Sequence, residues 1–550
     1  MPYEYEIPAV NGKPLVEIPK ELKDKVIDYT VLRDKIIIKA SDLVDQLLYD
    51  TRVKVRDELG RLVKSITEYS YPPTASAIVC KDEDYVYAYR PANNYKGYIL
   101  IDKGEAGVED AKVIQKAIDI VHEKGGGKVF IAADKYKGEI NPKPNVVIEG
   151  EGFATVLTNP TGRVIHFNNA GFFMTIRNLN IEDSEYAIIF RDDIALDQIT
   201  IENVIVRRCT HGIIDAGSKA NDIFGLTLNH VKLYGIKQRA ISFWSNAQGF
   251  YHFLDVTIDN LNVDRVTNEG DRAVHLAGMN GLVIQRFTEL GFHNGHGMVI
   301  DNVQFLWVDN MDIEDNYWSG LILNSVDRAL INNLRIATAA KTDSGAIGEA
   351  CLKMLNCTNI EINNIIAGTT QEDGNDVIVV GGTSDNIKIK GGTVDYSARY
   401  GIRLSDTVTN CIIEKIKFIG ITGAYDILEE GNSDHNKFIN NICEKGISWV
   451  GANTVVEGNT NFKTRNSGTA TFSGDGSTTD FLIGDHGLAV TDPNKIVVKV
   501  TPISADAIAA SPCVGYVDPN DNTKIRVKFA SAPASGTDNV KIAWTAEVIS

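Results

Sequence analysis

The stretch Ile-Arg-Asn-Leu-Asn-Ile at 176–181 returns as Ile-Glu-Asn-Val-Ile-Val at 201–206 and as Ile-Asn-Asn-Leu-Arg-Ile at 331–336. Copies of this phrase, some less regular, recur every 23 to 31 residues between about residues 176 and 445. A repeat of this length marks a solenoid, whose units bury their apolar side chains by stacking on one another. Because apolar and polar residues alternate, and the unit is too short for a helical hairpin, the units are predicted to be strands. The sequence therefore predicts an all-β chain built around a single-stranded parallel β-helix.

One position of the repeat forms a column along the solenoid. It is occupied by Asn178, Asn203, His230, Asn260, Arg286, Asn310, Asn333, Asn364, Gly391, Lys415 and Asn441. Asparagine tolerates the left-handed backbone of a tight bend, and its amide can hydrogen-bond to amides in the neighbouring coils. Glycine meets the same backbone demand. This asparagine column is predicted to be structural, with no catalytic role.

The segments on either side of the repeat predict three parts of the chain. Residues 109–123 have the apolar spacing of an amphipathic helix, which a Gly-Gly-Gly run ends and a strand at 128–132 follows. A helix at this place covers the open apolar end of the first coil. We predict an α-containing stem or attachment region at 1–95, the capped β-helix at 96–465, and an antiparallel β-sandwich at 466–550, where strands alternate with Gly- and Ser-rich turns.

The N-terminal region is predicted to contain a helix from Ser41-Asp42 towards Ile66. Leucine and valine residues seven apart are typical of a short coiled-coil stem. Gly60 interrupts this pattern, so an ordinary amphipathic helix is the favoured interpretation.

Composition narrows the classes of function. The chain has 550 residues and a formal charge of −17, which argues against a nucleic-acid partner, whose phosphates would be repelled. No apolar run is long enough to predict membrane insertion, and the N-terminus lacks the pattern of a secretory signal. The seven cysteines have an odd count and no CxxC spacing, so neither a disulfide framework nor a zinc site is predicted.

Two segments resemble a known superfamily. The similarity lies in Gly-Val-Glu-Asp-Ala-Lys-Val-Ile-Gln-Lys-Ala-Ile-Asp at 107–119 and Gly-Gly-Gly-Lys-Val-Phe-Ile at 125–131, which resemble the opening of pectate-lyase-like right-handed parallel β-helices, viral tailspike depolymerases in particular. Residues 132–136 depart from the family's usual Pro and Gly. The stretch Phe-Ser-Gly-Asp-Gly-Ser-Thr-Thr-Asp-Phe at 472–481 resembles a module of phage tail proteins. The resemblance implies a homotrimer with a polysaccharide partner, located on a virion tail or outside the cell.

A second column of the repeat carries chemically versatile side chains. It lies in the turn before the next apolar strand of each coil, so its members are expected to share one face, about 4.8 Å apart. This column and the residues beside it contain Asp271, Arg272, His296, Asp315, Tyr317, Trp318, Glu349, Asp373, Asp376 and Arg399. Carboxylates, cations and aromatic rings together suit sugars, whose apolar faces lie on rings while their hydroxyl groups bind polar side chains.

The spacing of the acids favours glycoside hydrolysis. That reaction usually requires two carboxyl groups, about 5 Å apart for retention and roughly 6.5–9.5 Å apart for inversion. Glu349 lies one coil from Asp373 and Asp376, so these three are the preferred catalytic group, and Asp271 is the next choice. Substrate binding is assigned to Arg272, His296, Asp315, Tyr317, Trp318 and Arg399.

Two other functions compete with hydrolysis. A polysaccharide lyase needs a neutralised uronate and a base, which Arg272 with His296 and Tyr317, or Arg239 with His211, can supply. A non-catalytic receptor-binding fibre would use the same face only to hold its ligand. No cofactor is predicted, since the acidic run at 372–376 lacks the alternation of a calcium loop and gives calcium little support.

Overall fold

The structure is a computed structural model that describes residues 75–91, 98–191, 194–216, 222–244, 252–267, 269–339, 349–369, 375–397 and 399–549, with four short strands before residue 75. The chain divides into two compact units, 1–74 and 75–550. In the first unit, β1 (Ala9–Val10) pairs with β2 (Lys13–Pro14), and β3 (Val31–Leu32) pairs with β4 (Lys35–Ile36). The helix predicted at 41–66 lies outside the described residues.

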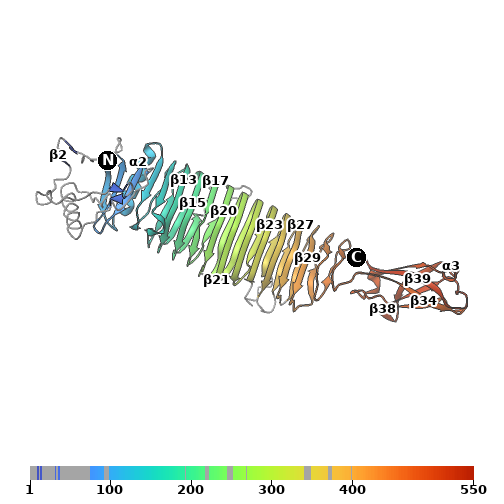
Figure 1. Ribbon diagram of the computed structural model, residues 1–550. Coiled ribbons are helices and arrows are strands. Elements are labelled where there is room, and N and C mark those ends of the chain that lie inside the picture. Colours follow the sequence, from blue (N-terminus) through green and yellow to red (C-terminus); the bar gives the residue numbers. More distant parts are fainter. Residues whose placement is uncertain are drawn as a thin grey trace. The chain divides into compact units, whose positions relative to one another are not determined.

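The second unit contains the predicted parallel β-helix, whose successive coils stack in sequence order (Figure 1). Each strand pairs in parallel with its equivalent one coil later; Ile176 lies opposite Ile201, for example. The coil strands are β8 (Gly127–Ile131), β9 (Asp134–Lys137), β10 (Val146–Gly150), β11 (Thr155–Thr158), β12 (Arg163–Phe167), β13 (Gly171–Glu182), β14 (Tyr186–Phe190), β15 (Ala195–Arg207), β16 (His211–Asp215), β17 (Asp222–Asn229), β18 (Lys232–Tyr234), β19 (Ile241–Phe243), β20 (Phe253–Asp264), β21 (Glu269–Asn316), β22 (Leu321–Asn324), β23 (Asp327–Ala339), β24 (Ala350–Leu355), β25 (Thr358–Thr369), β26 (Asp376–Gly381), β27 (Asp385–Asp395), β28 (Tyr400–Leu404), β29 (Ile412–Ile419), β30 (Tyr425–Glu429), β31 (Lys437–Ile439), β32 (Ile447–Ser448) and β33 (Val455–Glu457). The predicted fold class is confirmed.

The first coil is covered by a helix, as predicted. Helix α2 (Asp110–Glu123) buries Val113, Ile114, Ala117, Ile118 and Val121 in the core that the coils share. Strands β5 (Ala77–Lys81), β6 (Tyr85–Pro91) and β7 (Tyr98–Glu105) form an antiparallel meander beside it, and β5 pairs with β8. The apolar end of the solenoid is thereby removed from water.

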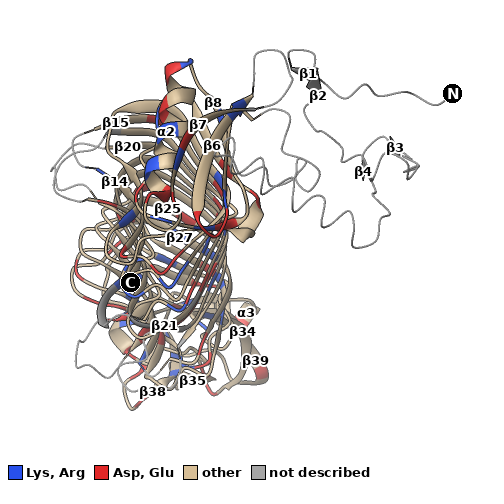
Figure 2. Ribbon diagram, turned by 90° about the vertical axis from the view of Figure 1, so that its left-hand side faces the viewer, with Lys and Arg blue, Asp and Glu red and all other residues tan. Residues whose placement is uncertain are grey.

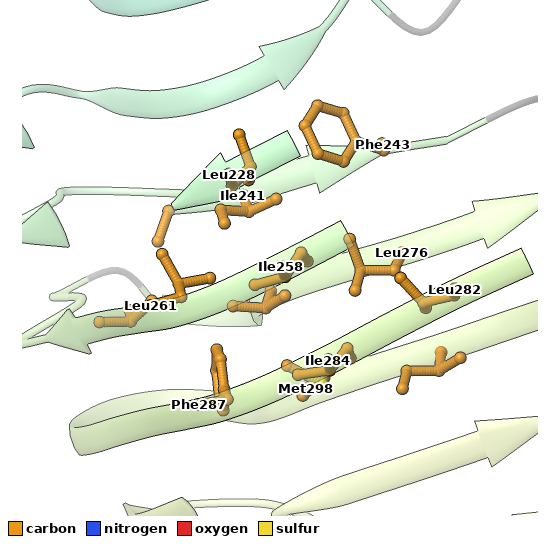
Figure 3. Packing of buried hydrophobic residues seen from close by; sticks show 14 of the residues in the cluster. Leu228, Ile241, Phe243, Ile258, Leu261, Leu276, Leu282, Ile284, Phe287 and Met298 are labelled. Atoms are coloured by element: carbon orange, nitrogen blue, oxygen red, sulfur yellow. The ribbon is translucent and has the colours of Figure 1, made fainter. Parts of the chain in front are cut away.

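One continuous hydrophobic cluster runs through the coils, from Ala77 to Phe462. Equivalent residues of successive coils form ladders within it: Leu228 lies opposite Ile258, and Ile258 lies opposite Ile284 (Figure 3). Burying each such side chain contributes about 1.5–3 kcal/mol. The short repeat is stable because every coil shares this core with two neighbours.

A carboxyl group interrupts one of these ladders. Glu289 lies opposite the buried Val263, in an inward-facing position, and is only 1% exposed. It accepts a hydrogen bond of 2.7 Å from Nδ2 of Asn316, which is also buried. Burial raises the pKa of Glu289 to about 8, so this side chain is mostly protonated at neutral pH.

The asparagine column has the left-handed backbone that the sequence predicts. Asn178, Asn203 and Asn364 have φ values of 56°, 51° and 61°. Nδ2 of Asn203 donates to Oδ1 of Asn178 at 2.7 Å, and Nδ2 of Asn364 donates to Asn333 at 2.9 Å, so the amides link coils.

One member of the column is corrected by the structure. The sequence assigns Asn441, but Asn440 occupies the left-handed position, with a φ of 55°. Asn441 faces inward, fully buried, and donates to the carbonyl oxygen of Ile413 at 3.0 Å. Two adjacent asparagines fit the repeat equally well, and only packing distinguishes them.

The C-terminal residues form two antiparallel three-stranded sheets, as the predicted β-sandwich requires. One contains β34 (Arg465–Gly474), β39 (Gly536–Val548) and β36 (Ile496–Pro502); the other contains β35 (Asp480–Asp485), β38 (Asp521–Phe529) and β37 (Cys513–Asp518). Helix α3 (Ala505–Ala509) and the 3-10 turn η3 (Pro493–Lys495) connect strands. Val527, Phe529, Val540 and Ile542 are buried together in the core of this part.

Charged residues of both signs occur along the solenoid, where acidic and basic positions are interspersed on the ribbon (Figure 2). All seven cysteines are described; none forms a disulfide, and all but Cys513 are buried. Burial raises the pKa of the Cys209 and Cys357 thiols to about 11. Within the described ranges, no helix is long and apolar enough to cross a membrane.

Candidate functional site on the turn strip

The turn residues singled out by the repeat follow one another in register. Tyr186 lies opposite His211, Ala350 opposite Asp376, and Tyr400 opposite Tyr425. We call these positions, with the residue immediately before each, the turn strip. It runs along the beginning of the strands β14, β16, β19, β22, β24, β26 and β28 and of two segments of β21. The strip places side chains of consecutive coils next to one another.

The central part of the strip brings together three of the predicted residues, the carboxylate of Glu349 and the rings of His296 and Trp318. Oε2 of Glu349 accepts hydrogen bonds from the hydroxyl and, at 3.2 Å, from the N–H of Ser319. Nδ1 of His296 lies 3.7 Å from the same oxygen, and its ring meets the indole of Trp318 edge-on at 5.0 Å. The Glu349 side chain stays 15% exposed. We call this the Glu349 cluster: a fixed, accessible carboxylate beside an imidazole and an aromatic ring.

Asp376 lies in a different environment. Its side chain is fully buried, and it accepts hydrogen bonds from Arg399 at 2.8 and 2.5 Å and from Nε of Arg403 at 2.7 Å. The carboxylate holds the pKa of Arg399 above its usual range. Removing one partner of a buried ion pair typically costs about 3–5 kcal/mol, because the other charge is left buried. This geometry suits a residue that positions Arg399 rather than one that meets a substrate.

The first part of the strip contains a neutral imidazole. The ring of His211 stacks on Tyr186 at 4.8 Å, with the planes 12° apart. Burial, and then the charge of Arg239, lower the pKa of His211. The neutral form, which can accept a proton, therefore predominates at neutral pH.

Arg272 begins a further cluster. Its Nη1 lies 3.3 Å from Nε2 of His275, whose ring centre is 6.5 Å from that of Trp244. The backbone N–H of Trp244 donates to Asp215 at 2.8 Å. Cationic and aromatic groups thus continue along the strip towards the Glu349 cluster.

The other predicted residues are not brought into these clusters. Asp315 occupies a left-handed bend with a φ of 66°, and Tyr317 projects from the surface, 45% exposed. Asp373 lies outside the described residues, as does the rest of 370–374. Asp271 belongs to β21, but its side chain is not described.

The sequence placed Ser319 in the turn column without a role and missed Arg403, His275 and Trp244. These three residues follow the turn positions that the repeat aligns. Two-residue alternation from Arg399 could have suggested Arg403 as an outward-facing partner, whereas His275 lies three residues after Arg272 and has no such signal. A metal centre has no support in the part of the chain that the structure describes, where no three His, Cys, Asp or Glu side chains form a cluster suited to one.

Comparisons with known proteins concern the fold. No protein-family model matches the chain, and no curated protein matches its sequence. Among solved structures, the A-module of the mannuronan C-5 epimerase AlgE6 of Azotobacter vinelandii is 16% identical, with a TM-score of 0.41, over 64% of this chain and 96% of that one. The pre-mature gene product 12 of bacteriophage phi29 is 13% identical, with a TM-score of 0.50, over 65% of this chain and 55% of that one. A tailspike protein mutant of E. coli bacteriophage HK620, in complex with pentasaccharide, is 12% identical, with a TM-score of 0.44, over 80% of this chain and 90% of that one. At these identities the likeness concerns the fold alone, and that fold is the parallel β-helix that the repeat predicts.

Proposed function

We propose that this chain binds a polysaccharide along the turn strip and cleaves it at the Glu349 cluster, as a tailspike-like depolymerase on a virion or extracellular surface. The observation that carries the proposal is the convergence of Glu349, His296 and Trp318 from consecutive coils. The resemblance of residues 107–131 to pectate-lyase-like proteins supports it.

Each residue of the cluster has a role in glycoside hydrolysis. Trp318 carries the apolar face of a sugar ring. Glu349 donates a proton to the glycosidic oxygen as its bond to the anomeric carbon breaks; water supplies the hydroxyl group of the new reducing end, and the second carboxylate takes the other proton of that water. Ser319 fixes the carboxylate rotamer through two hydrogen bonds, and the His296 imidazole, with Nδ1 3.7 Å from Oε2, lies beside Glu349.

We assign the second carboxyl group to Asp373, one coil from Glu349 in the repeat; Asp271 lies three coils from Glu349, about 14 Å, which is too far for a carboxyl pair. Asp376, the other first choice from the sequence, is enclosed by Arg399 and Arg403, so we reassign it as a positioning residue. Arg272 and Arg399 remain candidates for binding the substrate near the cluster.

The neutral imidazole of His211 favours a second candidate function. A lyase removes the proton next to a uronate carboxyl group and expels the sugar at the neighbouring carbon, leaving a double bond. His211 would accept the proton, and Arg239, whose charge lowers the pKa of His211, would neutralise the uronate. This reaction places the chemistry several coils from Glu349.

Product analysis tests both functions. The protein is incubated with a panel of neutral and acidic polysaccharides, and new reducing ends and the absorbance of unsaturated uronates are measured. We expect reducing ends without unsaturation, and about a 100-fold or greater loss of rate in Glu349→Gln, which keeps the shape of the side chain but cannot transfer its proton.

Glu361→Gln is the matched control, since Glu361 pairs with Lys390 on another face of the solenoid. Full cleavage by Glu349→Gln would overturn the proposed site. Unsaturated products that disappear in His211→Gln would favour the lyase. Binding without any product would favour the receptor-binding fibre.

A further inference from the structure

The face that carries the asparagine column contains a groove that the proposed function leaves unused. Its volume is about 330 Å³ and it spans three coils of β21 and β23. The buried side chains of Phe287 and Met311 form its floor, and Arg286, Asn310, Asn333 and Arg335 line its walls. We call it the asparagine groove. It is large enough for part of an oligosaccharide.

The walls offer donors and acceptors held in fixed positions. Nδ2 of Asn333 donates to Oδ1 of Asn310 at 3.2 Å, and Asn310 donates to Asp309 at 2.9 Å. The Asn310 amide keeps a second N–H for a ligand, since a primary amide has two, whereas Nδ2 of Asn333 also donates to Oδ1 of Asp309, at 3.4 Å. Because the coil spacing repeats the same amide about every 4.8 Å, the walls present a regular row of hydrogen-bonding groups.

Carboxylates outnumber guanidinium groups in and around the groove. Arg286 donates three hydrogen bonds to Asp259, of 2.9, 2.7 and 2.6 Å, and Nη1 of Arg335 binds Asp312 at 2.7 Å and also Glu314. Two guanidinium groups therefore face three carboxylates. A groove without surplus positive charge does not favour an anion, whereas the remaining guanidinium N–H groups can bind hydroxyl oxygens.

An apolar shelf lies outside the groove lining, on the strand segments that precede it along the chain. Trp307 is 50% exposed and lies three residues before Asn310 on β21, about 10 Å along the strand. Its neighbour in the next coil is Leu330, which is 39% exposed. Large exposed apolar side chains beside a polar groove match the two surfaces of a sugar, its apolar ring face and its hydroxyl rim.

We infer that the asparagine groove, with its Trp307 shelf, is a second carbohydrate-binding site, separate from the turn strip, that takes a neutral, hydroxyl-rich oligosaccharide segment. The inference extends the proposed function, on which it rests for the class of ligand. A second site on the same coils would hold a long polymer near the protein between cleavage events.

Titration calorimetry with short probes tests the inference on the full chain. The probes are the neutral hexamers of maltose, cellulose and mannan type, and the acidic hexamers of mannuronate and galacturonate. We expect at least one neutral hexamer to bind and to bind about tenfold more weakly to Trp307→Ala and to Arg335→Gln. Phe153→Ala is the control, because Phe153 is similarly exposed, at 46%, in the 3-10 turn η2 (Gly152–Ala154).

The outcomes separate this inference from the proposed function. If no neutral hexamer binds, or if Trp307→Ala and Arg335→Gln bind as tightly as the parent, the groove is not a carbohydrate site, even where Glu349→Gln abolishes cleavage. If the two groove variants lose binding and Phe153→Ala and Glu349→Gln do not, the second site stands, whether or not any polysaccharide is cleaved.

Discussion

At the scale of single residues, Glu289 is the side chain most at odds with its surroundings. It occupies an inward position where the preceding coil has Val263, and only Asn316 binds it among the described side chains. A protonated carboxyl group can share this site with the apolar core, whereas an ionised one would lack a compensating cation. The stability of the solenoid should therefore depend on pH through this one residue.

The sign of this pH dependence follows from the raised pKa of Glu289. Between the ordinary value of 4.5 and the folded value of about 8, the folded chain binds one more proton than the unfolded chain. The stabilisation is fully present at low pH and is lost as the pH rises through about 8. Relative to Glu289→Gln, the unfolding free energy of the parent should fall by about 1.4 kcal/mol per pH unit across this window.

Thermal unfolding at about pH 5 to 9 measures this difference. Glu361→Gln, on an exposed ion pair, controls for the loss of a charge. Parallel stability curves for the parent and Glu289→Gln would contradict the prediction.

Residue-scale features were the hardest to predict from the sequence. Glu289 stands three residues after Arg286 of the asparagine column, where other coils have Ile181 or Val206, so the repeat marks its position as inward-facing. Only the packing shows that this position accepts a carboxyl group. Glu349 was found because its turn position is shared with other coils, but the burial of Asp376 depends on Arg403, which belongs to the following coil. The period of the repeat predicts on which face of the solenoid a residue lies. Its exposure and its ion pairs depend on side chains of the neighbouring coils, so they cannot be predicted from the period alone.

At the scale of elements, the bends decide how each coil turns. Asn203 has a φ of 51° and donates across the coils to Asn178. An L-residue with a Cβ pays about 1–2 kcal/mol in this conformation unless its side chain compensates, and a net hydrogen bond contributes about 0.5–1.5 kcal/mol.

We therefore expect Asn203→Ala to destabilise the chain by about 2 kcal/mol, since alanine keeps the cost of the left-handed backbone and loses the hydrogen bond. Asn203→Gly should destabilise it by less, because glycine adopts this backbone without that cost and loses only the hydrogen bond. Chemical denaturation of both variants measures this order. Equal losses for alanine and glycine would show that the left-handed backbone contributes nothing.

The coils have a second set of left-handed bends, which were not predicted from the sequence. Left-handed residues also occur at Phe173, Gln198, Gly225, Asp255, Gly281, Phe305, Arg328, Asn359, Asn386, Asn410 and His435. In the earlier coils the residues of this set are chemically mixed, so the sequence shows no column there. Three consecutive members of the later coils, Asn359, Asn386 and Asn410, are asparagines, and Nδ2 of Asn386 donates to Oδ1 of Asn359 at 2.8 Å, as in the asparagine column.

At the scale of the whole molecule, we propose a homotrimer, the assembly that the resemblance of residues 107–131 to tailspike depolymerases leads us to expect. Phe172 and Phe224 lie in one outward column two coils apart, and both are exposed, at 47% and 41%. Three copies of a chain with a charge of −17 carry −51, so apolar contacts must outweigh their repulsion. Added salt screens that repulsion and should strengthen the assembly.

Light scattering checks this prediction. The expected mass is about 181 kDa, three times 60.3 kDa. The fraction of protein at this mass should stay the same or increase when salt is raised to about 0.5 M. Replacing Phe224 by Ser should weaken the trimer, while Phe153→Ser, which changes an exposed ring elsewhere, should not. A monomer mass at all salt concentrations would contradict the trimer.

The cysteines described above have a practical consequence. None of the seven described cysteines forms a disulfide, and six of the thiols are buried. Only Cys513, on β37, is partly open to reagents. At mildly alkaline pH, maleimide or iodoacetamide should thus attach one dye to the C-terminal part of the chain, which gives a marker for following single molecules on a glycan-coated surface.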